Sequence, residues 1–231
     1  MDTRASEHNC NLTKKDLYIV DFDGTLFRYD LLILYIIYHF FTFNDKVFLI
    51  TSFIGTKGEK LSAIREKIFL YFSSKYNMNE CFEKFSGIFF MKYLLRKKLL
   101  SFLNKVSKNN QTIFIITANY RFLVKAFLEK NNIIEKENLK IFGTELSEKT
   151  QSTHQQILRG RFKAKKLLEI IGEEKIQLKD IHNFFDSYED KYLCEYAKYN
   201  ILFSSSKQKK MFFKDNFDAL SFTDYLGKVP S

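Results

Sequence analysis

Residues that loosen or cross-link a chain are scarce in this sequence. Its 231 residues include one Pro, eight Gly and no Trp, and a chain so poor in Pro and Gly is not expected to be linker-rich or disordered. Its three cysteines, Cys10, Cys81 and Cys194, are widely scattered and form no CxxC pair. This spacing argues against a disulfide framework and against a cysteine-based zinc site.

Long hydrophobic runs are absent as well. The most apolar stretch, residues 31–43, is interrupted by Asn44-Asp45-Lys46 and is shorter than the about 20 residues that cross a bilayer. The polar residues 1–16 contain no apolar core, so we expect no standard signal peptide. The expected location is the cytoplasm.

Acidic residues are outnumbered by basic ones, 27 against 37, for a net charge of +10, which favours an anionic partner. Residues 91–110 contain six basic residues and no acidic one, with apolar residues at helical spacing. They predict a basic amphipathic helix. We favour a helix that packs on the core and exposes a solvated face. No nucleic-acid partner is expected, and contact with a membrane surface is the less favoured alternative.

Apolar and aromatic residues are abundant, with 26 Phe and 13 Tyr. Short apolar runs that predict strands alternate with segments of helical pattern, which is typical of an α/β fold with a parallel sheet and right-handed crossovers. The expected strands are 17–20, 112–117, 139–146, 181–186 and 200–203, and the expected helices are 121–132, 161–171 and 192–199. Residues 31–90 look helical and are too long for one crossover, so we interpret them as an inserted second domain.

Polar residues follow three of the expected strands. Asp21 and Asp23 follow the first, Thr117 ends the second, and Asp186 and Asp190 follow the fourth. In open α/β sheets, sites form beyond the carboxyl ends of the strands, so these residues are expected to converge. Carboxylates gathered at one edge need a cation, and their hard oxygen ligands suit Mg²⁺.

These residues stand in motifs that resemble those of the haloacid dehalogenase-like (HAD) phosphatases, in particular the phosphoserine-phosphatase-like branch. The resemblance covers about residues 17–205, in the family's order. DFDGT is similar to the nucleophile loop, IIT to the second motif, GRFK to the third, DSYED to the fourth, and GTEL to the stretch between the second and third; these are residues 21–25, 115–117, 160–163, 186–190 and 143–146.

The resemblance implies a Rossmann-like parallel-sheet core with a mainly helical cap inserted between the first and second motifs. The expected boundaries are a polar leader at 1–16, a core of 17–30 and 91–231, and a cap at 31–90. A cap of this kind closes over the site, supplies substrate contacts and excludes water.

The resemblance also implies a role for each motif residue. Asp21 would attack phosphorus and form an aspartyl-phosphate, and Asp23 would act as general acid and then general base. Thr117 and Lys163 would hold phosphate oxygens, and the amides that follow Thr117 are expected to open a helix, where anions bind. Mg²⁺ would be bound by Asp21, by the backbone carbonyl of Asp23 and by Asp186, with Asp190 in the second shell.

Two positions leave questions to the structure. Asp30 follows Asp21 by nine positions, where relatives often carry an acidic residue that faces the substrate, but it equally suits the N-cap of the next helix. Phe185 precedes Asp186 where relatives usually have Gly, which leaves open whether so bulky a side chain shifts the turn that presents Asp186 and weakens activity.

The favoured function is a Mg²⁺-dependent phosphomonoester hydrolase acting on a small phosphorylated metabolite. The second carboxyl group, Asp23, favours phosphoryl transfer over dehalogenation, because a halide needs no acid to leave. Open alternatives are a phosphotransferase of the same fold, a weakly active protein at a membrane surface, and a phosphatase of a lipid-linked phosphate.

Overall fold

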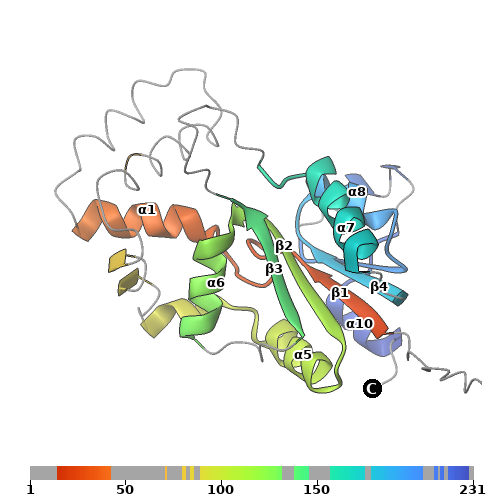
Figure 1. Ribbon diagram of the computed structural model, residues 1–231. Helices are drawn as coiled ribbons and strands as arrows, with labels where there is room; N and C mark the ends of the chain where they lie inside the picture. The colour runs from red at the N-terminus through yellow and green to blue at the C-terminus, as the bar shows by residue number, and fades with distance from the viewer. Residues whose placement is uncertain are drawn as a thin grey trace, which may run out of the picture.

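A parallel five-stranded sheet forms the centre of the protein in the computed structural model (Figure 1). The structure describes residues 15–42, 71, 80–81, 84–85, 89–131, 138–145, 157–174, 178–204, 211–212, 214–215 and 218–228. Within them the strand order is β3-β2-β1-β4-β5. The strands are β1 Lys15–Val20, β2 Thr112–Tyr120, β3 Leu139–Thr144, β4 Leu178–Phe185 and β5 Tyr199–Leu202. The predicted α/β fold is confirmed.

The central strand, β1, is apolar on both faces because both faces of the sheet are covered. Val20 pairs with Ile115 of β2 on one side and with Phe184 of β4 on the other. Successive side chains of a strand point to opposite faces, and Tyr18 and Val20 accordingly belong to one core cluster while Leu17 and Ile19 belong to another. This explains why the sequence of β1 is a continuous apolar run.

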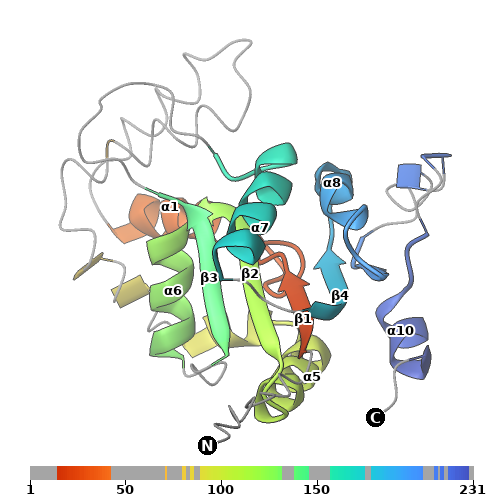
Figure 2. The same cartoon turned by 45° about the vertical axis from the view of Figure 1, so that its right-hand side comes forward.

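Helices cover both faces of the sheet (Figures 1 and 2). The cluster on the Val20 face includes residues of α1, α5, α6 and α10, whereas the other cluster includes residues of α7 and α8. The helices are α1 Leu31–Thr42, α5 Lys97–Lys108, α6 Arg121–Lys130, α7 Arg161–Glu174, α8 Lys191–Cys194 and α10 Phe222–Lys228. Among the described helices, none combines the length and the apolar character needed to cross a membrane.

The two ends of the predicted insertion lie side by side. Arg28 N–H donates to the carbonyl of Leu94 at 3.0 Å, and Arg96 N–H donates to the carbonyl of Leu26 at 2.9 Å, with Phe27 and Leu95 forming an antiparallel bridge between them. The chain therefore leaves and re-enters the core at neighbouring points. Most of residues 43–88 lie outside the described residues, so the helical cap at 31–90 stays a prediction, supported at its start by α1.

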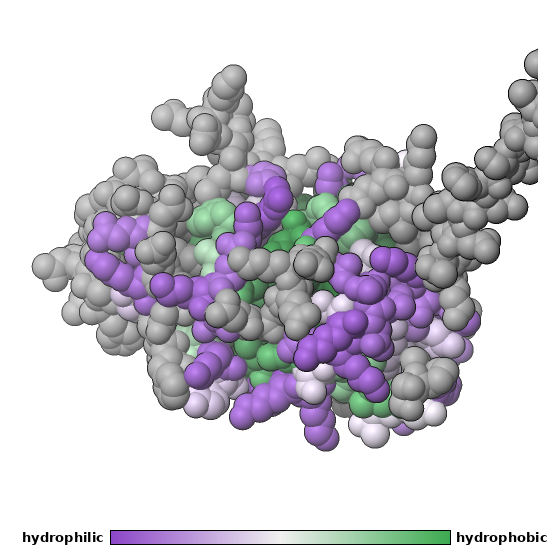
Figure 3. All heavy atoms as spheres, turned by 60° about the horizontal axis from the view of Figure 1, so that its bottom comes forward, coloured by the Kyte–Doolittle hydropathy of each residue, from purple (hydrophilic) through white to green (hydrophobic). Residues whose placement is uncertain are grey.

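The basic segment differs from its prediction at one end. Residues 89–94 form a short 3-10 helix, η1 Phe89–Leu94, and α5 begins only at Lys97, because Leu95 and Arg96 are extended and pair with the loop after β1. From Lys97 on, α5 buries Leu99 and Leu103 and exposes its lysines, as expected of a core-packing helix. Figure 3 brings this side of the molecule forward and shows mainly hydrophilic residues around apolar ones.

Smaller differences concern element ends. β1 begins at Lys15 and not at residue 17, so the last two residues of the expected leader belong to the sheet. The helix expected at 192–199 ends at Cys194, because Lys198 N–H donates to the carbonyl of Ile181 and Tyr199 already starts β5.

Candidate active site

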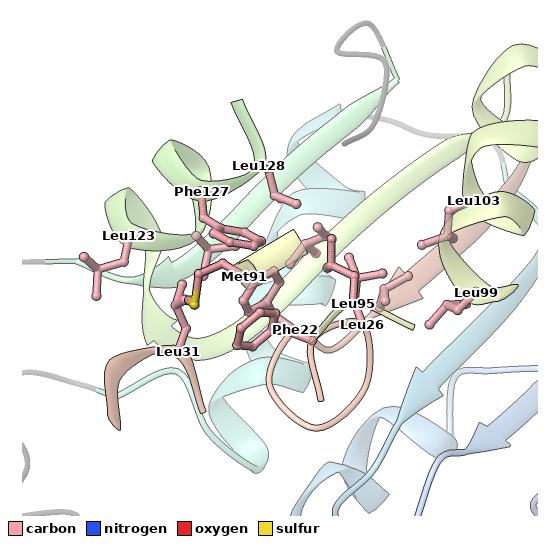
Figure 4. Packing of buried hydrophobic residues seen from close by; sticks show 14 of the residues in the cluster. Phe22, Leu26, Leu31, Met91, Leu95, Leu99, Leu103, Leu123, Phe127 and Leu128 are labelled. Carbon is pink, nitrogen blue, oxygen red and sulfur yellow. The ribbon is translucent and has the colours of Figure 1, made fainter. Parts of the chain in front are cut away.

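The loop after β1 is anchored by its apolar residues, which leaves its carboxylates on the opposite side. Phe22 is fully buried and packs against Phe27 at 5.6 Å and Phe127 of α6 at 5.9 Å between ring centroids. Figure 4 shows Phe22 and Leu26 within this cluster. Asp21 and Asp23, on either side of Phe22, both line a cavity of about 370 Å³. The alternation of apolar and acidic residues thus orients the loop.

The cavity brings together every residue that the sequence analysis assigned to the site. They come from the loop after β1, from β2, from the first turn of α7 and from the segment after β4, and the full set is Asp21, Asp23, Asp30, Thr117, Lys163, Asp186 and Asp190. The strands that precede them are neighbours in the sheet, so their carboxyl ends meet at one edge, as expected. Their chemical roles remain proposals.

Lys163 connects two carboxylates at the inner end of the cavity. Its Nζ lies 2.8 Å from Asp21 Oδ1 and 2.9 Å from Asp190 Oδ1, and its side chain is almost fully buried. Burial alone would lower the pKa of Lys163, but Asp190 and Asp21 outweigh burial and raise this pKa above its ordinary value. Lys163 is therefore a permanent cation. Its neighbours Lys165 and Lys166 pair instead with Glu169 on the surface.

Asp21 and Asp186 are carboxyl groups in an unfavourable environment. Burial raises the pKa of Asp21 to about 6, Lys163 opposes this rise, and Asp186 adds to it. Burial and the neighbouring Asp190 also raise the pKa of Asp186. A cation beside both groups would favour their ionised forms and so lower both pKa values.

The donor set suits magnesium. A Cβ atom on Gly24 would lie 2.0 Å from Asp186 Oδ2, so the carboxylate of Asp186 rests directly against the backbone of the Asp21 loop. Among the residues that the structure describes, no three His, Cys, Asp or Glu side chains gather as a metal site. Mg²⁺ is usually held by only one or two carboxylates, completed by phosphate and water oxygens. Asp21 and Asp186 provide two such carboxylates at one cavity.

Phe185 is accommodated away from the cavity. Its side chain is fully buried in a small cluster with Cys194, Leu202, Phe212 and Ala219, and its ring lies 5.1 Å from that of Phe212. Asp186 nevertheless reaches Gly24. The bulky side chain points into the core beneath the C-terminal segment and not into the cavity.

Asp23 is held by a hydrogen bond to each carboxyl oxygen. Leu31 N–H, at the start of α1, donates to Oδ1 at 2.8 Å, and Asn119 Nδ2 donates to Oδ2 at 3.0 Å. Burial, and then the charge of Asp30, raise the pKa of Asp23 well above its usual range, although the two hydrogen bonds oppose the rise. A carboxyl group that retains its proton near neutral pH is suited to general acid catalysis.

Asn119 is a site residue that the sequence analysis missed. It lies two residues after Thr117 on β2, and positions i and i+2 of a strand share a face; a polar residue at that spacing was the available signal.

The structure also corrects the expectation that a helix opens directly after Thr117. β2 continues to Tyr120 and α6 begins at Arg121, and Asn119 N–H donates to Thr117 Oγ1 at 3.0 Å.

Asp30 caps α1 and also lies at the cavity, while its contact with a substrate stays a prediction. Its Oδ1 accepts a hydrogen bond from Ile33 N–H at 3.1 Å, the geometry of an N-cap for α1, and the residue also lines the cavity. Two arginines that the sequence analysis did not assign, Arg28 and Arg159, line it as well. Arg159 pairs with Glu189 at 2.8 Å.

Comparisons with solved structures agree with the fold. A protein of unknown function from Bordetella pertussis Tohama I is 13% identical, with a TM-score of 0.55, 90% of this chain covered and 99% of that chain. A phosphoserine phosphohydrolase-like protein from Francisella tularensis subsp. tularensis SCHU S4 is 18% identical (TM-score 0.53; 93% and 98% covered). Cytosolic 5'-nucleotidase IIIB bound to cytidine is 14% identical (TM-score 0.59; 90% and 80%).

At these identities the likeness concerns the fold alone. The motifs indicated the phosphoserine-phosphatase-like branch, and the Francisella protein with this fold is named phosphoserine phosphohydrolase-like. No curated protein matches the chain in sequence. The family model described as haloacid dehalogenase-like hydrolase matches residues 19–191, well over half of the 231 residues. Together with the parallel sheet and the four motifs converging on one cavity, this match establishes that the chain belongs to the haloacid dehalogenase-like hydrolase family.

Proposed function

We propose that the protein is a Mg²⁺-dependent phosphomonoester hydrolase that acts on a small phosphorylated metabolite through an aspartyl-phosphate on Asp21. The observation that carries the proposal is the pair of unlike carboxyl groups on one cavity. Burial raises the pKa of both, but the cation Lys163 at 2.8 Å limits the rise for Asp21 to about 6, whereas the charge of Asp30 adds to the rise for Asp23, to about 8. A nucleophile must be ionised and a general acid protonated, and the two environments differ in that sense.

The reaction would proceed in two displacements. An oxygen of Asp21 attacks phosphorus, the bond from phosphorus to the ester oxygen breaks, and Asp23 gives its proton to the leaving oxygen. Asp23, now a carboxylate, takes a proton from water as that water attacks the aspartyl-phosphate. The bond between phosphorus and Asp21 then breaks, which releases phosphate and restores both side chains.

The other groups of the cavity would hold the phosphoryl oxygens. Lys163 has three N–H donors, and contacts with Asp21 and Asp190 use two, which leaves one for phosphate. Thr117 Oγ1 accepts from Asn119 N–H and keeps its own proton to donate. Mg²⁺, held by Asp21, Asp186 and the Asp23 carbonyl, would supply charge neutralisation, which is most of phosphoryl-transfer catalysis.

A phosphotransferase would use the same aspartyl-phosphate with an acceptor hydroxyl in place of water. The cavity of about 370 Å³ suits a small substrate, and a cap formed by residues 31–90 would close over it. We place the reaction in the cytoplasm. Analysis of the products formed with added alcohols separates hydrolysis from transfer, because only transfer yields a new phosphate ester.

The proposal is tested by screening phosphorylated metabolites with Mg²⁺ against wild type and Asp21→Asn. Wild type is expected to release phosphate only with the metal, and Asp21→Asn is expected to release none. Asp218→Asn, at an exposed position away from the cavity, serves as the matched control and should keep full activity. Phosphate release that survives in Asp21→Asn would show that another residue is the nucleophile.

A further inference from the structure

Asn119 connects three parts of the site through one buried side chain. Only 3% of the residue is exposed. Its Nδ2 donates to Asp23 Oδ2 at 3.0 Å, its Oδ1 accepts from Tyr120 N–H at 2.8 Å, and its backbone N–H donates to Thr117 Oγ1 at 3.0 Å. The N–H of Tyr120 allows one amide orientation, because a flipped amide would place its NH₂ group against that N–H.

The contact with Asn119 determines how freely Asp23 can turn. One oxygen of Asp23 is held by Leu31 N–H at 2.8 Å and the other by Asn119. With both bonds the plane of the carboxyl group is fixed. Without Asn119 a single hydrogen bond remains, and the group can rotate about its Cβ–Cγ bond. Delivery of a proton to a leaving oxygen requires alignment, so the second bond matters for the acid step.

We propose that Asn119 is a positioning residue that aligns Asp23 with the leaving oxygen and so enables the site to cleave phosphomonoesters whose leaving group is a strongly basic alkoxide. The inference rests on the proposed phosphatase function. The side-chain amide of Asn119 is occupied by Asp23 and the N–H of Tyr120. Loss of Asn119 therefore weakens proton transfer to the leaving group and spares the attack of Asp21 on phosphorus.

The basicity of the leaving group distinguishes this role from a purely structural one. A weakly basic phenolate leaves without protonation, whereas an alkoxide needs a proton in the transition state. p-Nitrophenyl, phenyl and benzyl phosphate are similar in size and present leaving groups of increasing basicity. A structural defect lowers kcat/KM of all three in proportion, whereas misalignment of Asp23 lowers kcat/KM most for benzyl phosphate.

The test uses Asn119→Ser, because Ser stays small and polar but is too short to reach Asp23. With Mg²⁺ present, kcat/KM on benzyl phosphate is expected to fall by about tenfold or more, and kcat/KM on p-nitrophenyl phosphate by less than about threefold, because kcat/KM reports formation of the aspartyl-phosphate and not its hydrolysis. Asn131→Ser is the matched control, since Asn131 Nδ2 donates to the carbonyl of Phe127 at the other end of α6. It should leave the ratio of the two rates unchanged.

A double-mutant comparison shows whether Asn119 acts through Asp23. In an Asp23→Asn background, Asn119→Ser should cause no further loss on benzyl phosphate, because residues that act as a unit are not additive. Equal losses on all three esters, no loss at all, or full additivity with Asp23→Asn would each overturn the inference. Thermal unfolding of both serine variants confirms that they are folded. If wild type itself cleaves none of the esters, the proposed function fails and this inference falls with it.

Discussion

Gly24 is the residue of the loop after β1 that lies against the carboxylate of Asp186, and it tolerates no side chain. Its φ of +77° is in the left-handed region, and a Cβ would lie 2.0 Å from Asp186 Oδ2 and 2.4 Å from Asp186 Cγ. Gly24→Ala is expected to lower the free energy of unfolding by about 1–2 kcal/mol through backbone strain and to abolish the response to Mg²⁺ by displacing Asp186. Urea unfolding and phosphate release measure the two effects.

The control for Gly24 is Gly172, which lies in α7 with no atom within 4 Å of an added Cβ. Gly172→Ala should stabilise the protein by about 0.5–1 kcal/mol, because Gly is unfavourable within a helix. If Gly24→Ala behaves like Gly172→Ala and keeps its response to Mg²⁺, the assignment of Asp186 to the metal is wrong.

Asp21 is also expected to make stability depend on pH. Its pKa rises from 3.8 to about 6 on folding, mainly through burial, so the folded state binds the proton more tightly than the unfolded state. The destabilisation is therefore fully present above about pH 6 and disappears as the pH falls towards 4, with a size of about 3 kcal/mol at most.

The measurement for this pH dependence is urea unfolding of metal-free wild type and Asp21→Asn between pH 4 and 7.5. Because Asn cannot ionise, the stability of Asp21→Asn relative to wild type should increase from pH 4 to about 6 and then stay constant. Parallel pH curves for the two proteins would contradict the raised pKa.

At the scale of elements, the end of β4 joins the site to the C-terminal segment. Asp186 faces the cavity, while the preceding Phe185 packs on Phe212 and its carbonyl accepts from Phe203 N–H at 2.7 Å. Phe185→Ala leaves a cavity in this cluster and should cost about 3–5 kcal/mol of stability, without raising activity. Phe162→Ala, at a position 45% exposed, should cost far less. Comparable losses in the two variants would argue against the packing role of Phe185.

At the scale of the whole molecule, Mg²⁺ is expected to stabilise the fold, because its ligands come from segments that meet only when the sheet is assembled. A ligand at 100 times its Kd adds about 2.7 kcal/mol to the free energy of unfolding. Mg²⁺ should therefore raise the Tm of wild type and not that of Asp186→Asn. Asp180→Asn, which removes the pair with Lys198 outside the cavity, should keep the increase. An equal increase in all three proteins would mean that the metal binds elsewhere.

Local pattern was enough to predict much of this protein. The apolar runs of β1 and β2 identify strands buried on both faces, and the helical spacing of apolar residues identifies α6 and α7 as helices buried on one face. The order of the motifs then indicated the family, and strand ends indicated Asp21, Thr117 and Asp186. The family and these site residues could be predicted because each signal lies within a short stretch of the chain.

Tertiary structure decided the rest. α5 starts late because Leu95 and Arg96 pair with the distant loop after β1, and Phe185 packs away from the cavity because Phe212 provides a core for it. The contact between Asp23 and Asn119 joins positions far apart in the chain. Sequence spacing determines which face of an element a residue occupies, but hydrogen bonds between elements depend on how the sheet and its loops pack, and only the assembled fold sets those distances.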